Sequence, residues 1–158
     1  MSGLKKWLCS KLGCEDEPTF RFRHTYTVLG SELARCVREV YPSTWLRVAD
    51  VNYHYVDWEE LLKWLNTDSL DKMKWVEDIW DCDNFSIESF CRMKRLGKQL
   101  GINPAYGEAW GDTPLGYHAF NMTFVKKDEM QKIIIIEPRN DDTKEWKKSD
   151  YKPDFIKF

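Results

Sequence analysis

The stretch DCDNFSIESFCRMKRLGKQLG, residues 81–101, is the segment around which the rest of the chain is organised. Its apolar side chains recur every three or four residues, which is the spacing of one buried helical face. Asp83 is a suitable N-cap for this helix, so Cys82 stands at the mouth of a long helix. The apolar positions are Ile87, Phe90, Met93, Leu96 and Leu100.

Two strands are predicted after this helix, GYHAFNMTFVK at 116–126 and QKIIIIEPR at 131–139. The linker between them is short, which favours an antiparallel hairpin. With the turn at Lys127 and Asp128, His118 lies directly opposite Glu137, at the end of an apolar row. A carboxylate in that position holds an imidazole in one tautomer and stabilises its protonated form.

Cys82, His118 and Glu137 are the candidate catalytic residues, as nucleophile, base and orienting carboxylate. A thiol at a helix N-terminus lies near unpaired backbone N–H groups and the positive end of the helix dipole, and both favour the thiolate. If the helix packs across the hairpin, Cys82 approaches His118. The alternative is that Cys82 is a small buried apolar residue and that His118 is a structural histidine.

The other histidines and cysteines are not part of a comparable group of catalytic residues. His24 and His54 are interpreted as structural, and no spacing calls for zinc held by either of them with Cys82 and His118. The five cysteines show no paired CxxC spacing and are expected to be reduced thiols of a cytosolic protein. They are Cys9, Cys14, Cys36, Cys82 and Cys91.

Three parts are expected along the chain: an N-terminal extension at 1–43, a core at 44–140 and a charged tail at 141–158. The extension is predicted to hold a short helix within 1–18, a strand at 21–30 and a helix at 31–41. A helix at about 57–66 is predicted within the core, and 101–114 is predicted to be loop because of its prolines and glycines. A homodimer through the N-terminal segment is one assembly that this extension suggests.

The charge and hydropathy of the chain exclude some classes of binding partner. With 24 basic and 26 acidic residues the formal net charge is −2, which gives no field that would favour nucleic acid or an anionic membrane. No apolar run approaches the length of a membrane span or resembles a secretory signal, so we expect no membrane partner and a cytoplasmic location.

The sequences DCDNF, GYHAFN and IIEPR occur in this order and resemble the C-terminal protease domain of the fungal Marasmius-type agglutinins and related bacterial and phage proteins. The resemblance spans about 47–140. It implies an α+β papain-like cysteine peptidase fold, with the central helix packed on a small antiparallel sheet. It also implies a peptide or protein substrate and the roles given above for Cys82, His118 and Glu137.

This chain departs from the pattern in two places. The stretch KWVEDIWD before Cys82 offers no glutamine to complete an oxyanion hole, so the backbone N–H of Cys82 is the one donor that can be named. Only about 43 residues precede the region of resemblance, so lectin activity is not implied.

Two acids bracket the thiol. Asp81 and Asp83 disfavour thiolate formation, and a hard divalent cation bound to their oxygens would cancel this effect. The resemblance implies calcium dependence as well, so Asp81 and Asp83 are the candidate metal ligands and calcium is the candidate cofactor. The alternative is that Asp83 is only a helix cap and Asp81 a solvated partner of a lysine.

The function predicted from these observations is a cysteine hydrolase, acting on peptide bonds and activated by calcium. Two alternatives stay open. One is a binding or virion-associated module that keeps the fold without turnover, as the missing glutamine suggests. The other is a phage or bacterial cell-wall amide hydrolase, because the DCxxF motif followed by a histidine on a strand also resembles the cell-wall endopeptidases.

Overall fold

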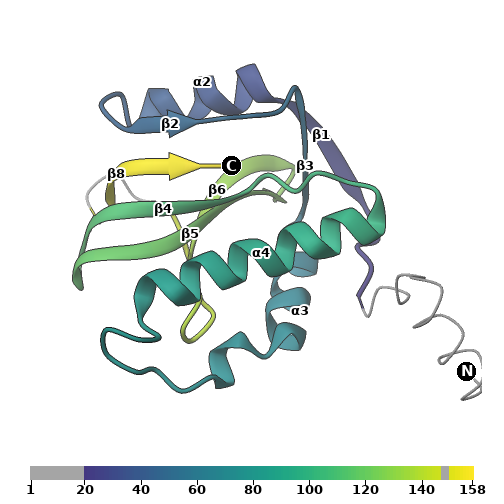
Figure 1. The fold of residues 1–158 in the computed structure, drawn as a ribbon. Helices are drawn as coiled ribbons and strands as arrows, with labels where there is room; N and C mark the ends of the chain where they lie inside the picture. Colours follow the sequence, from purple (N-terminus) through teal and green to yellow (C-terminus); the bar gives the residue numbers. More distant parts are fainter. Residues whose placement is uncertain (1–19, 147–149) are drawn as a thin grey trace, which may run out of the picture.

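The computed structural model describes residues 20–146 and 150–158. The predicted helix within 1–18 lies outside the described residues. In sequence order, the elements are β1 (Thr25–Leu29), α2 (Gly30–Val40), β2 (Trp45–Arg47), β3 (Asn52–Asp57), α3 (Trp58–Asp68), the 3-10 helix η1 (Leu70–Lys72), α4 (Cys82–Leu100), β4 (Tyr106–Thr113), β5 (Gly116–Lys127), β6 (Met130–Glu137), β7 (Asp142–Glu145) and β8 (Lys152–Lys157) (Figure 1).

Eight strands of the described chain form one mixed sheet. The strand order is β1-β3-β5-β4-β8-β2, and β6 and β7 continue the sheet from β5. The pairs β3–β5 and β2–β8 are parallel and the other pairs are antiparallel. The prediction of a small antiparallel sheet is therefore wrong, although the central helix lies where it was expected.

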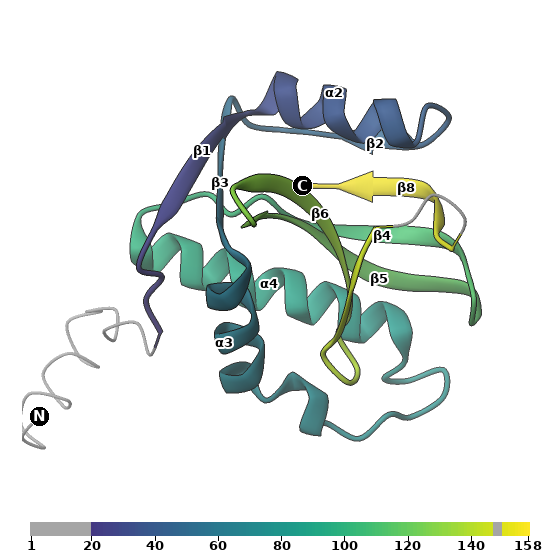
Figure 2. The ribbon, with the colours of Figure 1, turned by 180° about the vertical axis from the view of Figure 1, so that it is seen from behind.

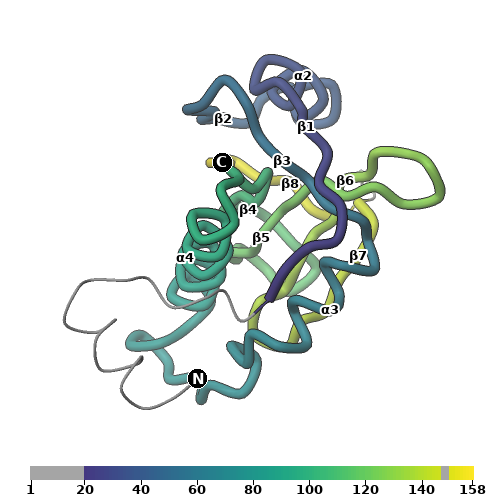
Figure 3. Tube along the Cα trace, turned by 90° about the vertical axis from the view of Figure 1, so that its right-hand side faces the viewer, coloured from purple at the N-terminus to yellow at the C-terminus, as the bar shows by residue number. Residues whose placement is uncertain are grey.

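Helices cover both faces of this sheet. Figure 3 shows α2 on one side of the strands and α3 and α4 on the other. Side chains alternate along β5, so that Phe120, Met122 and Phe124 belong to the core beneath α2, whereas Val125 belongs to the core beneath α3 and α4. The strands thus bury both faces, which explains why apolar residues are nearly continuous in β5 and β6.

The segments predicted to flank the core take part in it. Val28 of β1 and Leu33 and Val37 of α2 are buried in the same cluster as Phe120. At the other end of the chain, β8 lies between β4 and β2, and Ile156 is fully buried. Residues 25–40 and 152–158 are therefore parts of the sheet and of its core.

The segment 101–114 holds a strand where loop was predicted. Tyr106–Thr113 pairs with β5 on one side and with β8 on the other. A Cβ at Gly111 would overlap the Lys152 carbonyl oxygen, so this glycine allows β8 to approach closely. Glycine marks a close backbone contact here and not the end of the strand.

Candidate functional site

Cys82 is the first residue of α4, and Asp81 is the N-cap. The Asp81 backbone N–H donates to Asn84 Oδ1 (3.3 Å), while the Asn84 backbone N–H donates to Asp83 Oδ1 (2.9 Å). The prediction that Asp83 is the N-cap is thus wrong by two residues. Cys82 is a free, partly exposed thiol, placed where the orphan N–H groups and the dipole of a long helix favour negative charge.

His118 and Glu137 are in direct contact. His118 Nε2 lies 2.5 Å from Glu137 Oε2, and the two side chains are 13% and 12% exposed. The Arg139 backbone N–H donates to the other carboxylate oxygen (3.4 Å). Because Nε2 is engaged by the carboxylate, the second ring nitrogen, Nδ1, is the one that can face a further group.

The register that brings this pair together differs from the predicted one. The turn is centred on Asp128 and Glu129, both with positive φ, and Lys127 pairs with Met130. Extended along the hairpin, this register puts Phe120 opposite Glu137, so His118 meets Glu137 diagonally. The hairpin was predicted correctly, and the contact survives the error because an offset of two residues keeps both side chains on one face.

Hydrogen bonds fasten the start of α4 to β5. Ser86 Oγ donates to the Phe120 carbonyl (3.0 Å), and Asn121 Nδ2 donates to the Ser86 carbonyl (3.0 Å). One turn of helix separates Ser86 from Cys82, and His118 lies just before Phe120 on the strand. The N-terminal end of α4 and the β4–β5 turn accordingly lie at the same end of the molecule (Figures 1 and 2).

His118 leaves the sheet on the face of Phe120, whereas Asn121 points to the α4 face. His118 therefore lies on the face of the sheet that α2 covers, whereas Cys82 belongs to α4 on the opposite face. Cys82 is the first residue of α4 and His118 is the third residue of β5, so both belong to the end of the sheet that holds the β4–β5 turn.

The acids at the helix start interact with each other. A hydrogen bond with Asp81, together with burial, raises the pKa of Asp83 above its ordinary value. Two carboxylates in such contact share either a proton or a cation. Asp81 and Asp83 therefore fit a divalent ion as two oxygen ligands.

A second acidic group lies where η1 meets the β6–β7 turn. One carboxylate oxygen from each of Asp68, Asp71 and Asp141 lies within 4.8 Å of the others, and no other group of three metal-binding side chains occurs among the described residues. Burial and then the charges of Asp68 and Asp71 raise the pKa of Asp141 to about 7. This group was not predicted from the sequence, because Asp141 is far along the chain from Asp68 and Asp71.

The remaining histidines have structural partners, as predicted. His54 Nδ1 accepts a hydrogen bond from the Asn103 backbone N–H (3.1 Å), and His24 Nδ1 lies 3.5 Å from Asp57 Oδ2. Neither joins Cys82 or His118 in a metal-binding group of the described chain.

Trp80 is a residue that the sequence analysis missed. Its ring packs edge-on against Phe85, with centroids 6.1 Å apart. Its indole N–H is buried and has no acceptor among the residues that the structure describes. Trp80 lies two residues before Cys82. The burial of its indole N–H follows from the packing and could not be predicted from the sequence.

Comparisons with solved structures show that other chains have a similar fold. No family model and no curated protein sequence matches the chain. A solved structure titled PSL1a–E64 complex matches with a TM-score of 0.69 and 20% identity over 84% of this chain and 51% of that chain. Polyporus squamosus lectin bound to the human-type influenza-binding epitope Neu5Acα2-6Galβ1-4GlcNAc matches with a TM-score of 0.65 and 19% identity over 84% and 49%.

These comparisons correct several predictions. The chain spans about half the length of each of these chains, and the second title names a lectin. The resemblance to the papain-like protease domain of the Marasmius-type agglutinins is overturned by this finding. The predictions of a papain-like fold class, of a cysteine hydrolase and of a cell-wall amide hydrolase are therefore also wrong. The titles name E64 and a glycan as what those proteins bind, where a peptide substrate was predicted for this chain.

Proposed function

We propose that this chain is a ligand-binding module whose site is formed by Cys82, His118 and Glu137. The observation that carries the proposal is the His118–Glu137 contact of 2.5 Å at the end of the sheet where α4 begins with a partly exposed thiol. The similar structure whose title names E64 supports a small electrophilic ligand. Binding in this proposal is capture by the thiol, without turnover.

The proposed capture uses the three side chains in turn. Glu137 accepts a hydrogen bond from the protonated Nε2 of His118. This leaves Nδ1 as a proton acceptor. Nδ1 takes the Cys82 proton, the sulfur attacks a carbon of the epoxide in E64, and the C–O bond breaks as the C–S bond forms. The imidazolium then returns the proton to the new alkoxide, so that a thioether and a hydroxyl group are the products.

Mass spectrometry with E64 tests this proposal. We expect one adduct per chain, mapped to Cys82, and alkylation about 100-fold slower in His118→Ala, since a positioned base contributes about that factor. Cys36→Ser and Cys91→Ser are matched controls and should label like the parent chain, because both remove a free, partly exposed thiol away from the site. Equal alkylation of Cys36, Cys82 and Cys91 would overturn the proposal.

Calcium belongs to this proposal as a cofactor. Asp81 and Asp83 would hold the ion next to the thiol, and Asp68, Asp71 and Asp141 offer a second set of carboxylates. Carboxylate oxygens are the ligands that calcium prefers. When bound beside Cys82, the ion would offset the negative charge that disfavours the thiolate.

Glycan binding is a second candidate, favoured by the lectin structure that holds Neu5Acα2-6Galβ1-4GlcNAc. Titration of this trisaccharide into the chain, followed by amide chemical shifts in NMR, tests it. Saturable shifts confined to one surface support the candidate. Unchanged spectra at millimolar glycan exclude it for this ligand.

A further inference from the structure

Exposed apolar side chains gather on the two segments that lead into the proposed site. Of the eleven large apolar residues exposed in the described chain, Met73, Trp75, Val76 and Ile79 precede Cys82, and Leu115 and Tyr117 precede His118. Ile79, Leu115 and Tyr117 are 73%, 67% and 62% exposed. Apolar groups concentrated in this way around a site usually mark a surface that binds something.

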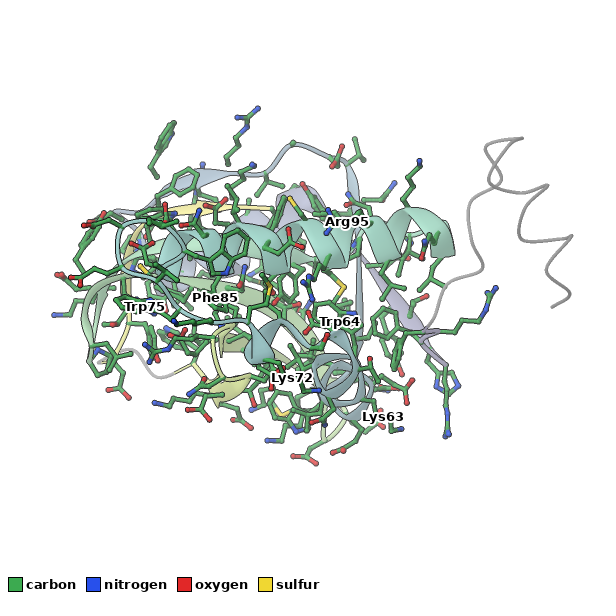
Figure 4. All side chains as sticks on the ribbon, turned by 60° about the horizontal axis from the view of Figure 1, so that its bottom comes forward. Lys63, Trp64, Lys72, Trp75, Phe85 and Arg95 are labelled. Carbon is green, nitrogen blue, oxygen red and sulfur yellow. The ribbon has the colours of Figure 1, made fainter. Side chains whose placement is uncertain are left out.

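The segment before Cys82 is held in place. Val76 N–H donates to the Trp80 carbonyl (2.9 Å), and Trp80 N–H donates back to the Val76 carbonyl (2.7 Å). Trp80 in turn packs on Phe85, which is fully buried in the first turn of α4. Figure 4 shows Trp75 at the same end of the molecule as Phe85. The exposed side chains of this loop are thus presented by an ordered turn tied to the start of α4.

The segment before Cys82 is also acidic. Glu77, Asp78, Asp81 and Asp83 lie within seven residues around Cys82, where Lys74 is the nearest base in the sequence. Asp112, exposed on β4, lies between Tyr117 on β5 and Lys152 on β8, so a base partly offsets its charge. Carboxylates grouped around a site raise the local concentration of cations and speed their arrival.

We infer that the ligand of the Cys82 site carries an apolar group next to a positive charge. This inference rests on the proposed thiol site and names the class of ligand that it takes. The apolar group would contact Ile79 and Tyr117, and the cation would lie near Glu77 and Asp78. A neutral or anionic ligand of the same shape would gain only the apolar contact.

Three epoxysuccinyl-leucine amides test this inference, ending in a guanidinium group as in E64, in an uncharged amide and in a carboxylate. We expect Cys82 alkylation by the cationic probe to be about 10-fold faster than by the neutral probe at low salt, and slowest with the anionic probe. The difference should shrink in 0.5 M salt, where exposed charges are screened within a few ångströms.

Surface variants locate the effect. Glu77→Gln with Asp78→Asn should reduce the advantage of the cationic probe, whereas Glu32→Gln, an exposed acid on α2, should not. Ile79→Ser and Tyr117→Ser should slow all three probes by a similar factor. Val51→Ser, at a residue that is 74% exposed on another part of the surface, is the control for them.

The outcomes separate the two proposals. Equal rates for the three probes at Cys82 would overturn the inference and leave the thiol site standing. Alkylation of Cys82 no faster than of Cys36 and Cys91 with every probe would overturn the proposed function and the inference together.

Discussion

Asn121 joins the sheet to the start of α4, because its side-chain amide donates to the carbonyl of Ser86 at 3.0 Å and to that of Gly107 at 3.2 Å. Asn121 is fully buried, and it lies three residues after His118 on the same strand. One side chain therefore fixes the helix that carries Cys82 against the strand that carries His118.

Asn121→Ala should destabilise the fold and slow labelling of Cys82. It leaves two buried carbonyls without this donor, and we expect a loss of about 2–3 kcal/mol in the free energy of unfolding, measured by urea titration. Asn66→Ala, which removes an exposed amide hydrogen bond within α3, should cost less than about 1 kcal/mol. A labelling rate that does not change in folded Asn121→Ala would show that this contact does not position the thiol.

Glu137→Gln should slow the reaction of Cys82 with E64 without unfolding the chain. The amide keeps the shape of the carboxylate but no longer stabilises a protonated His118, and its NH₂ group can bind the wrong tautomer. We expect alkylation about 10-fold slower or more. Nitrogen-15 NMR of the imidazole should show a mixture of tautomers in the variant and one tautomer in the parent. A single unchanged tautomer would contradict this reasoning.

Asp141→Asn should stabilise the protein at alkaline pH. Burial and the neighbouring Asp68 and Asp71 raise the pKa of Asp141 to about 7 in the folded state, against about 4 in the unfolded chain. Stability from this group is therefore full below about pH 4 and is lost as the pH rises through 7. Because solvent screens part of the effect at a half-buried carboxylate, we expect a gain of about 1–2 kcal/mol at pH 8.

The gain from Asp141→Asn should disappear as the pH falls to about 4, which urea titrations at several pH values would measure. Asp154→Asn, at an exposed aspartate on β8, is the control and should have little effect at either pH. A gain that stays constant from pH 4 to pH 8 would mean that the titration of Asp141 is not its cause.

Calcium should raise the melting temperature of the parent chain, and a chelator should reverse the increase. An ion present at 100 times its Kd adds about 2.7 kcal/mol to the free energy of unfolding. Asp81→Asn with Asp83→Asn, and Asp68→Asn with Asp71→Asn, should reveal which acids are responsible. If calcium leaves the melting temperature and the thiol reactivity of the parent unchanged, neither group of acids is a calcium site.

Local signals predicted most of the helices and the hairpin. The helices at 31–41, 57–66 and from Asp83 were expected from their apolar spacing and correspond to α2, α3 and α4 within one or two residues at most ends. The hairpin of β5 and β6 followed from two apolar runs with a short link. These features depend on neighbouring residues, so a single sequence contains the information.

The strands that depend on distant partners were not predictable in the same way. β4 contains Gly107 and Gly111, which favour a loop when read alone, but each lies against the backbone of β8. β8 itself is short and charged, and only its place between β4 and β2 makes it a strand. The formation of β8 thus depends on contacts with distant strands, which no local sequence pattern shows.

The site was predictable in part. Alternation along the hairpin was enough to place His118 and Glu137 on one face, even with the register off by two residues. The apolar side chains around the site and the group formed by Asp68, Asp71 and Asp141 come from separate segments. Their grouping required the three-dimensional structure.

The position of β8 also affects how the chain is made. Within the described sheet β2 pairs only with β8. Trp45 can therefore pair with a neighbouring strand only after Phe155 has been synthesised. A ribosome releases these two residues at widely separated times, and until the later one emerges the unpaired edges of β4 and β2 stay open to other chains. We therefore expect this protein to complete its fold after synthesis, slowly, and to benefit from chaperones during the interval.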